Sequence, residues 1–122
     1  MEKVTGIGGF FFRAQDTKAL AAWYRDTLGV NLVPEGPDDA PWIQEAGPTV
    51  FAPFSADTDY FGRDDQAFML NFRVNDLDAM LAQLREADID ISREEEMEGV
   101  GRFARIHDPE GNPIELWEPA GG

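Results

Sequence analysis

The stretch Phe12-Arg13-Ala14-Gln15-Asp16 returns as Phe72-Arg73-Val74-Asn75-Asp76, at a spacing of 60 residues (position 72 against position 12). The correspondence continues along the chain through the pairs Ala19/Ala79, Ala22/Ala82 and Arg25/Arg85. Self-similarity at a fixed spacing indicates repeated structural units. The sequence therefore predicts two related modules within one chain.

Each copy predicts a strand followed at once by a helix. In the second copy, Phe68, Leu70, Phe72 and Val74 alternate with Met69, Asn71 and Arg73, which is the period of a strand. The first copy has the same parity over residues 9–14. Asp16 and Asp76 then stand where a carboxylate can cap a helix, and apolar residues follow at helical spacing. Gly29 is expected to end the first helix.

Short strand candidates follow each helix, at residues 30–34, 42–46 and 49–53 and again at 89–92, 102–107 and 113–118. We expect residues 108–112, Asp-Pro-Glu-Gly-Asn, to form the turn of the last hairpin. The predicted fold class is α+β, with tandem βαβββ modules in a single domain over residues 1–122. Module one covers about residues 4–53 and module two residues 67–119. Residues 54–66 form an acidic crossover loop, read as a linker or as a lid over a site.

Composition limits the partners and the chemistry. The 122 residues include 24 acidic and 10 basic ones, for a formal net charge of −14. Such a charge should repel nucleic acid and anionic membranes, so neither is expected as a partner. The chain has no Cys and a single His, His107, which rules out disulfides and thiolate chemistry. Neither a signal peptide nor a membrane span is apparent, so the expected location is cytoplasmic.

The order of elements, the helix segment Ala19-Leu20-Ala21-Ala22-Trp23-Tyr24 and the closing run from His107 to Pro119 together resemble the vicinal oxygen chelate superfamily. This superfamily includes glyoxalases, bleomycin-resistance proteins and extradiol dioxygenases. The resemblance implies that the modules form a curved mixed sheet around a shared cavity. It also implies pairing of the exposed strand edges in a homodimer.

The resemblance also locates the metal-ligand positions of the superfamily. They fall on Gly9, on Met69, on Thr49 or Phe51, and on Glu115. Only Glu115 carries a suitable donor, and a zinc site normally needs three or four protein ligands. The sequence therefore predicts no metal and no cofactor.

Glu115 and His107 are the candidate catalytic residues. Glu115 is expected to face the cavity and either acts on a ligand or pairs with Arg105 across the hairpin. His107 either faces the cavity mouth, where an imidazole would suit proton transfer, or lies on the surface. The residues expected to line the ligand pocket are Phe11, Met69, Asn71, Phe103, Arg105 and Trp117.

The predicted function is metal-independent binding or sequestration of a small, partly aromatic or cationic molecule in this pocket. The alternative is a metal-dependent lyase or dioxygenase of the same superfamily with a rearranged site. That site would combine Glu115 with His107, Glu45 or a loop acid, Asp57 or Asp59. A third possibility is an interaction domain whose cavity is packed shut by its aromatic side chains.

Overall fold

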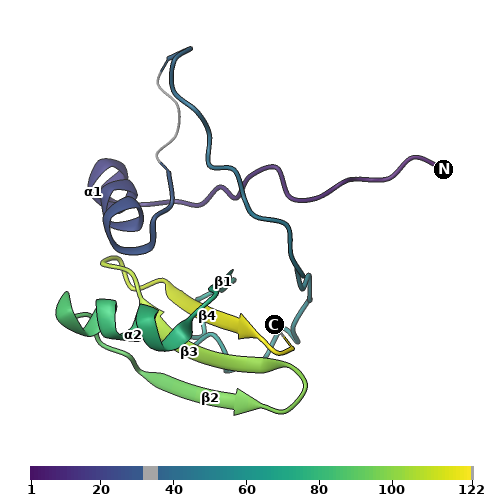
Figure 1. The fold of residues 1–122 in the computed structure, drawn as a ribbon, viewed down its shortest axis with the longest axis vertical. Helices are drawn as coiled ribbons and strands as arrows, with labels where there is room; N and C mark the ends of the chain where they lie inside the picture. Colours follow the sequence, from purple (N-terminus) through teal and green to yellow (C-terminus); the bar gives the residue numbers. More distant parts are fainter. Residues whose placement is uncertain (32–35, 122) are drawn as a thin grey trace.

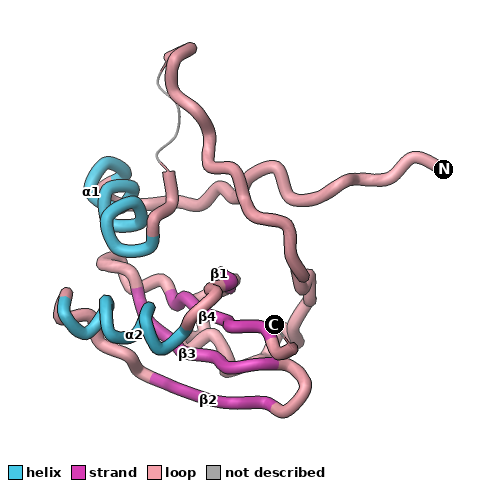
Figure 2. The backbone as a smooth tube through the Cα atoms, in the orientation of Figure 1, coloured by secondary structure: helices cyan, strands magenta, loops and turns pink. Residues whose placement is uncertain are grey.

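The computed structural model describes residues 1–31 and 36–121. It has an α+β fold in which one mixed sheet carries a helix on one face (Figures 1 and 2). The helical elements are α1 (Thr17–Trp23), η1 (Tyr24–Leu28) and α2 (Leu77–Glu86). The strands are β1 (Leu70–Arg73), β2 (Arg93–Met97), β3 (Gly101–His107) and β4 (Pro113–Pro119). Their order in the sheet is β1-β4-β3-β2, with β1 parallel to β4 and the other neighbours antiparallel.

The helix boundaries predicted from the repeat are confirmed. The carboxylates of Asp16 and Asp76 accept hydrogen bonds of 3.0 Å from the amides of Ala19 and Ala79. Each bond satisfies an amide that has no partner inside its own helix. Gly29 ends η1 with a φ of 76°, a left-handed conformation that glycine adopts at little cost.

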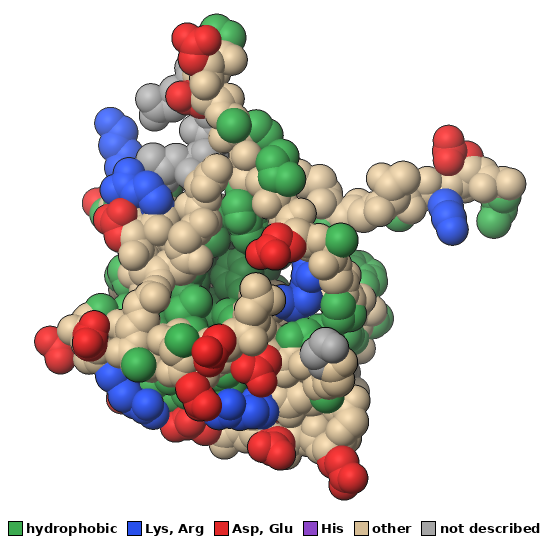
Figure 3. Space-filling view, viewed as in Figure 1, with side chains coloured by type: hydrophobic (Ala, Val, Ile, Leu, Met, Phe, Trp, Pro, Cys, Tyr) green, Lys and Arg blue, Asp and Glu red, His purple; other side chains and the backbone are tan. Residues whose placement is uncertain are grey.

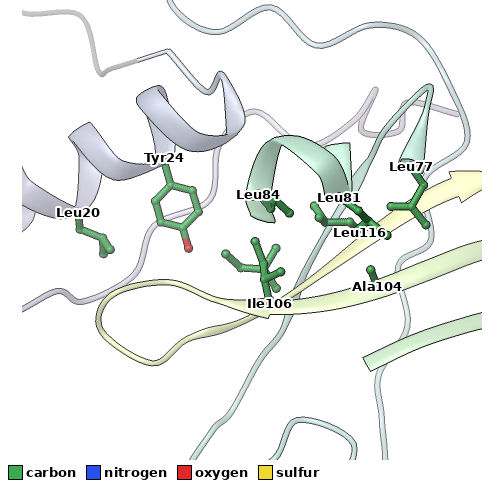
Figure 4. Packing of buried hydrophobic residues seen from close by; sticks show 9 residues of the cluster. Leu20, Tyr24, Leu77, Leu81, Leu84, Ala104, Ile106 and Leu116 are labelled. Atoms are coloured by element: carbon green, nitrogen blue, oxygen red, sulfur yellow. The ribbon is translucent and has the colours of Figure 1, made fainter. Parts of the chain in front are cut away.

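The core lies between α2 and one face of the sheet (Figure 4). In β3 and β4, residues of one parity face the helix, and the side chains of Ile106 and Ile114 are fully buried there. Leu77, Leu81 and Leu84 meet them from α2, at the spacing that places all three on one side of a helix. Burial of these side chains is the main source of stability in this half of the chain.

A hydrogen-bond network at the β3–β4 turn docks α1 and η1 onto the core. The buried Tyr24 hydroxyl donates to Asp108 Oδ2 at 2.7 Å, while Glu110 accepts from the amides of Gln15 and Asp16. Burial, followed by the bond to Asp108, raises the pKa of Tyr24 well above its ordinary value. The predicted turn is confirmed, since the Asp108 amide donates to the Asn112 carbonyl and Gly111 has a φ of 85°.

The strands expected in the first half are not confirmed, and neither is the division into tandem βαβββ modules. Residues 9–14, 42–46 and 49–53 run as extended segments without strand pairing (Figure 2). The expected strand at 30–34 lies largely outside the described residues. A strand is stable only when a neighbour accepts and donates its ladder hydrogen bonds, and alternation in sequence cannot supply that neighbour.

In the second half, the expected strand at 89–92 is also wrong. The Ile89 amide is still bonded to the Leu84 carbonyl at the end of α2, and the ladder of β2 begins only at Arg93. The remaining strands, β1, β3 and β4, fall where the sequence predicts them. Within the described residues, no helix is long and apolar enough to cross a membrane.

Candidate functional site

The sheet face opposite α2 carries a polar and aromatic cluster at its centre. Strand register brings Arg105 opposite Glu115 and Phe103 opposite Trp117 on β3 and β4, and Asn71 beside Glu115 on β1. The rings of Phe103 and Trp117 are stacked, with centroids 6.1 Å apart and planes 3° from parallel. Trp117 is held further by a 2.9 Å hydrogen bond from its Nε1 to the Val100 carbonyl. The two stacked rings lie on the sheet next to the charged residues Arg105 and Glu115.

Glu115 is buried and bonded through both carboxylate oxygens. Asn71 Nδ2 donates to Oε1 at 2.7 Å, and the Tyr60 hydroxyl donates to Oε2 at 2.5 Å. Tyr60 comes from the crossover segment 54–66, 55 residues away in sequence. Burial, and then its bond to Glu115, raises the pKa of the Tyr60 phenol. The phenol of Tyr60 therefore stays protonated at neutral pH and donates a hydrogen bond to the Glu115 carboxylate.

Arg105 is buried, with 9% of its surface exposed, but it forms no ion pair with Glu115 in the described part of the chain. Its guanidinium instead lies over the Tyr60 ring, 4.6 Å from the centroid. The Nε and Nη2 atoms have no hydrogen-bond partner within the described structure. Because buried polar groups are nearly always bonded, two unpaired donors on one buried cation mark a place for an acceptor.

A small cavity separates these groups. Its volume is about 10 Å³, which is room for one water molecule. Arg93 borders it from β2, 5.2 Å from the Tyr60 centroid, and is paired with Glu95 at 2.8 Å. The residues that line the cavity are Tyr60, Arg93, Glu95, Phe103, Ala104, Arg105 and Glu115. Tyr60 is the lining residue that comes from the crossover segment.

The fold brings together part of the residue set that the sequence singles out. Asn71, Phe103, Arg105 and Glu115 meet around the cavity, and Trp117 lies against Phe103. The sequence analysis did not place Tyr60 and Arg93 in the site. The available signal was the presence of Tyr60 and Phe61 in an acidic loop, because large aromatic side chains are rarely left in solvent.

Three predicted site residues lie elsewhere. His107 is exposed at the end of β3, beside the turn, and does not line the cavity. Phe11 is 95% exposed, and Met69 is half-buried just before β1 without lining the cavity. Alternation along a strand predicts which face of the sheet a side chain takes, but not whether other parts of the chain cover it there. His107 stands at the end of β3, where the face is open to solvent.

The donors around Glu115 do not fit a metal centre. Among the described residues, no group of three or more His, Cys, Asp or Glu side chains could hold an ion. Both oxygens of Glu115 already accept hydrogen bonds, and Gly9 has no side chain to contribute. Within residues 1–31 and 36–121, the superfamily's metal therefore lacks a ligand set, and His107, one of the partners considered for Glu115 in the rearranged enzyme site, does not line the cavity.

The fold matches known structures along nearly the whole chain. The antibiotic binding protein TnmS3 from Streptomyces sp. CB03234 is 24% identical, with a TM-score of 0.66 over 98% of this chain and 100% of that one. A lactoylglutathione lyase from Agrobacterium tumefaciens is 16% identical, with a TM-score of 0.61 over 95% of both chains. A glyoxylase/bleomycin resistance protein/dioxygenase domain from Frankia sp. EAN1pec is 18% identical, with a TM-score of 0.60 over 96% and 99%.

The glyoxalase-like domain family matches residues 9–117. The chain therefore belongs to the glyoxalase-like family, within the vicinal oxygen chelate superfamily that its closing run resembles. Among curated proteins, none matches the chain. Structural likeness at these identities establishes the fold, and the activity has to be argued from the site.

Proposed function

We propose that this protein binds a small, partly aromatic molecule at the cavity between β3, β4 and Tyr60, without a metal ion. The observation that carries the proposal is Arg105, a buried cation with unpaired Nε and Nη2 donors beside the cavity. An acceptor oxygen on a ligand would satisfy these donors. The stacked pair Phe103 and Trp117 would contact an apolar or aromatic part of the same molecule.

Of the partly aromatic or cationic molecules expected from the sequence, the charged groups around the cavity favour the aromatic ones. Glu95 is paired with Arg93, and Glu115 accepts two hydrogen bonds, so the acids near the cavity already have partners. The unsatisfied groups are donors. A molecule with an aromatic ring and acceptor oxygens therefore fits better than a purely cationic one, despite the negative net charge of the whole chain. The antibiotic binding relative has the same fold and makes aromatic antibiotics reasonable first probes.

Replacing Arg105 with Met should weaken binding. Titrations of bleomycin and other aromatic antibiotics, followed by tryptophan fluorescence in buffer with a chelator, would measure it. Bonds to a charged donor contribute about 1.5–3 kcal/mol, so we expect the Kd of a bound antibiotic to rise roughly 10- to 150-fold. Arg85→Met is the matched control, since Arg85 is an exposed arginine on α2, and it should leave the Kd unchanged.

Two outcomes would contradict the proposal. One is saturable binding that appears only when a transition metal is supplied, with stoichiometric zinc, nickel, manganese or iron by elemental analysis. The other is binding that is indifferent to Arg105→Met while wild-type protein binds in the chelator. The first would instead favour the metal-dependent alternative.

We further propose that the protein works as a homodimer. The chain exposes 9306 Å², whereas a folded monomer of 13.6 kDa exposes about 6,600 Å² by the usual size scaling. The excess of roughly 2,700 Å² per chain amounts to roughly 5,400 Å² over two chains, at the upper end of the range that permanent dimers bury. Figure 3 shows apolar surface around the hollow beside the sheet. The large apolar side chains that are more than half exposed all belong to the first half of the chain: Met1, Val4, Ile7, Phe11, Ile43, Val50 and Phe51.

Sedimentation equilibrium should give a mass about twice 13.6 kDa. Phe51→Asp places a charge on the exposed apolar surface and should shift the protein toward monomer at micromolar concentration. Val100→Asp is the control, because Val100 is also exposed but lies in the turn between β2 and β3, outside the strand edges and the first-half segments. A monomeric wild-type protein, or equal effects of both substitutions, would contradict the dimer.

A further inference from the structure

Tyr60 makes contacts that a bound ligand would be expected to make. Its hydroxyl donates to the buried carboxylate of Glu115, and its ring lies over the guanidinium of Arg105, 4.6 Å from the centroid. Arg93 approaches the same ring at 5.2 Å. One phenol group thus satisfies an acceptor through its hydroxyl and attracts two cations through its π-face.

The segment that carries Tyr60 is loosely held to the sheet. Residues 55–66 contain only turns and bends, whose backbone hydrogen bonds stay within the segment. Among the described residues, the bond from Tyr60 to Glu115 is the one hydrogen bond that joins segment 54–66 to a strand. Release of this single side chain would open the cavity without breaking any strand pairing.

A purely structural anchor leaves part of the site unexplained. The Tyr60 ring covers the face of the Arg105 guanidinium, but Nε and Nη2 stay unpaired although Arg105 is more than nine-tenths buried. An acceptor oxygen on a larger molecule could reach these donors, whereas Tyr60 has no further polar atom to offer. Arg105 therefore offers donor capacity that Tyr60 does not use.

We propose that Tyr60 is a built-in substitute for the ligand, and that the ligand is a phenol: an aromatic ring whose hydroxyl takes the place of the Tyr60 hydroxyl on Glu115. A further oxygen of the ligand accepts from Arg105. The inference rests on the proposed function and narrows its ligand class. Binding then has two steps, because Tyr60 must leave before the phenol can occupy its position, and the population in which Tyr60 is displaced limits the apparent affinity.

The excised side chain provides the test. Tyr60→Gly removes the whole side chain, which corresponds to 4-methylphenol, so 4-methylphenol added in solution should bind to this variant and raise its melting temperature. Toluene has the same ring and methyl group but no hydroxyl. We expect 4-methylphenol to bind Tyr60→Gly at least tenfold tighter than toluene does, and at least tenfold tighter than it binds wild-type protein.

The readout is the Nε–Hε resonance of Arg105 in ¹⁵N spectra, together with tryptophan fluorescence. Adding Glu115→Met to Tyr60→Gly removes the acceptor and should abolish the preference for 4-methylphenol over toluene. If Tyr60→Gly does not fold, Tyr60→Phe serves instead, since it keeps the ring and loses only the hydroxyl. Tyr60→Phe should then bind 4-methylphenol more tightly than wild-type protein does.

The outcomes separate this inference from the proposed function. Equal affinities for 4-methylphenol and toluene, or a preference that survives Glu115→Met, would overturn the phenol assignment even if wild-type protein binds an antibiotic. Conversely, Tyr60→Gly could prefer 4-methylphenol while wild-type protein binds none of the antibiotics tested. That result would support the phenol-accepting chemistry of the site and contradict antibiotic capture.

Discussion

Replacing Asp108 with Ala should lower the free energy of unfolding by about 2–5 kcal/mol, because it strands several donors that cost roughly 1–3 kcal/mol each when buried and unpaired. Asp108 is 4% exposed and accepts from the Tyr24 hydroxyl, the Asn112 side chain and the amides of Glu110 and Asn112. Its loss should also release η1 from the β3–β4 turn. Urea denaturation followed by far-ultraviolet circular dichroism would measure the change.

Asp64→Ala is the control for Asp108, since Asp64 is exposed in the crossover segment, and it should change the stability by less than about 0.5 kcal/mol. An effect of Asp108→Ala no larger than this would contradict the network described at the turn. Asp108→Asn keeps the shape and one acceptor, so it should fall between wild type and Asp108→Ala.

The same network predicts how stability depends on pH. Burial and the bond to Asp108 raise the pKa of Tyr24 above its ordinary 10.0, so the native state holds this proton more tightly than the unfolded state does. The stabilisation is complete below pH 10 and is lost as pH rises above 10, at up to about 1.4 kcal/mol per pH unit. Tyr24→Phe should reduce that slope in urea titrations between pH 9 and 11. Tyr60 contributes a slope of the same sign, because its pKa is also raised.

Leu84→Ala should destabilise the protein by about 2–5 kcal/mol, the usual cost of emptying a fully buried leucine position. Leu84 is 0% exposed and packs from α2 onto the sheet face that carries Ile106 and Ile114 (Figure 4). The destabilisation within this range depends on how far the neighbouring side chains move into the space left by Leu84. Thermal or urea denaturation gives the number directly.

Glu86→Ala is the matched control on the same helix, because Glu86 is exposed near the end of α2. It should change the stability by less than about 0.5 kcal/mol. Leu84→Met keeps most of the buried volume and should cost less than about 1.5 kcal/mol. If Leu84→Ala were no worse than Glu86→Ala, α2 would not cover the core as described.

Much of the second half could be predicted from local sequence signals. Helix caps, alternation in β1, β3 and β4 and the turn at 108–112 each depend on residues within a few positions of one another. The faces taken by Glu115 and Trp117 follow from parity alone. The first half carried similar alternation but no pairing in the described residues, because a strand needs a partner that its own residues do not specify.

The candidate site, too, has features that the sequence predicts and features that only the tertiary structure reveals. Sequence by itself determined the family, and it predicted the face of the sheet on which the carboxylate at position 115 lies. Only the tertiary structure decided that Tyr60, 55 residues away, bonds Glu115 and that Arg105 keeps two unpaired donors. Contacts between a loop and a strand depend on how the chain folds back in space, and the periodic pattern of residue types along the chain does not predict this.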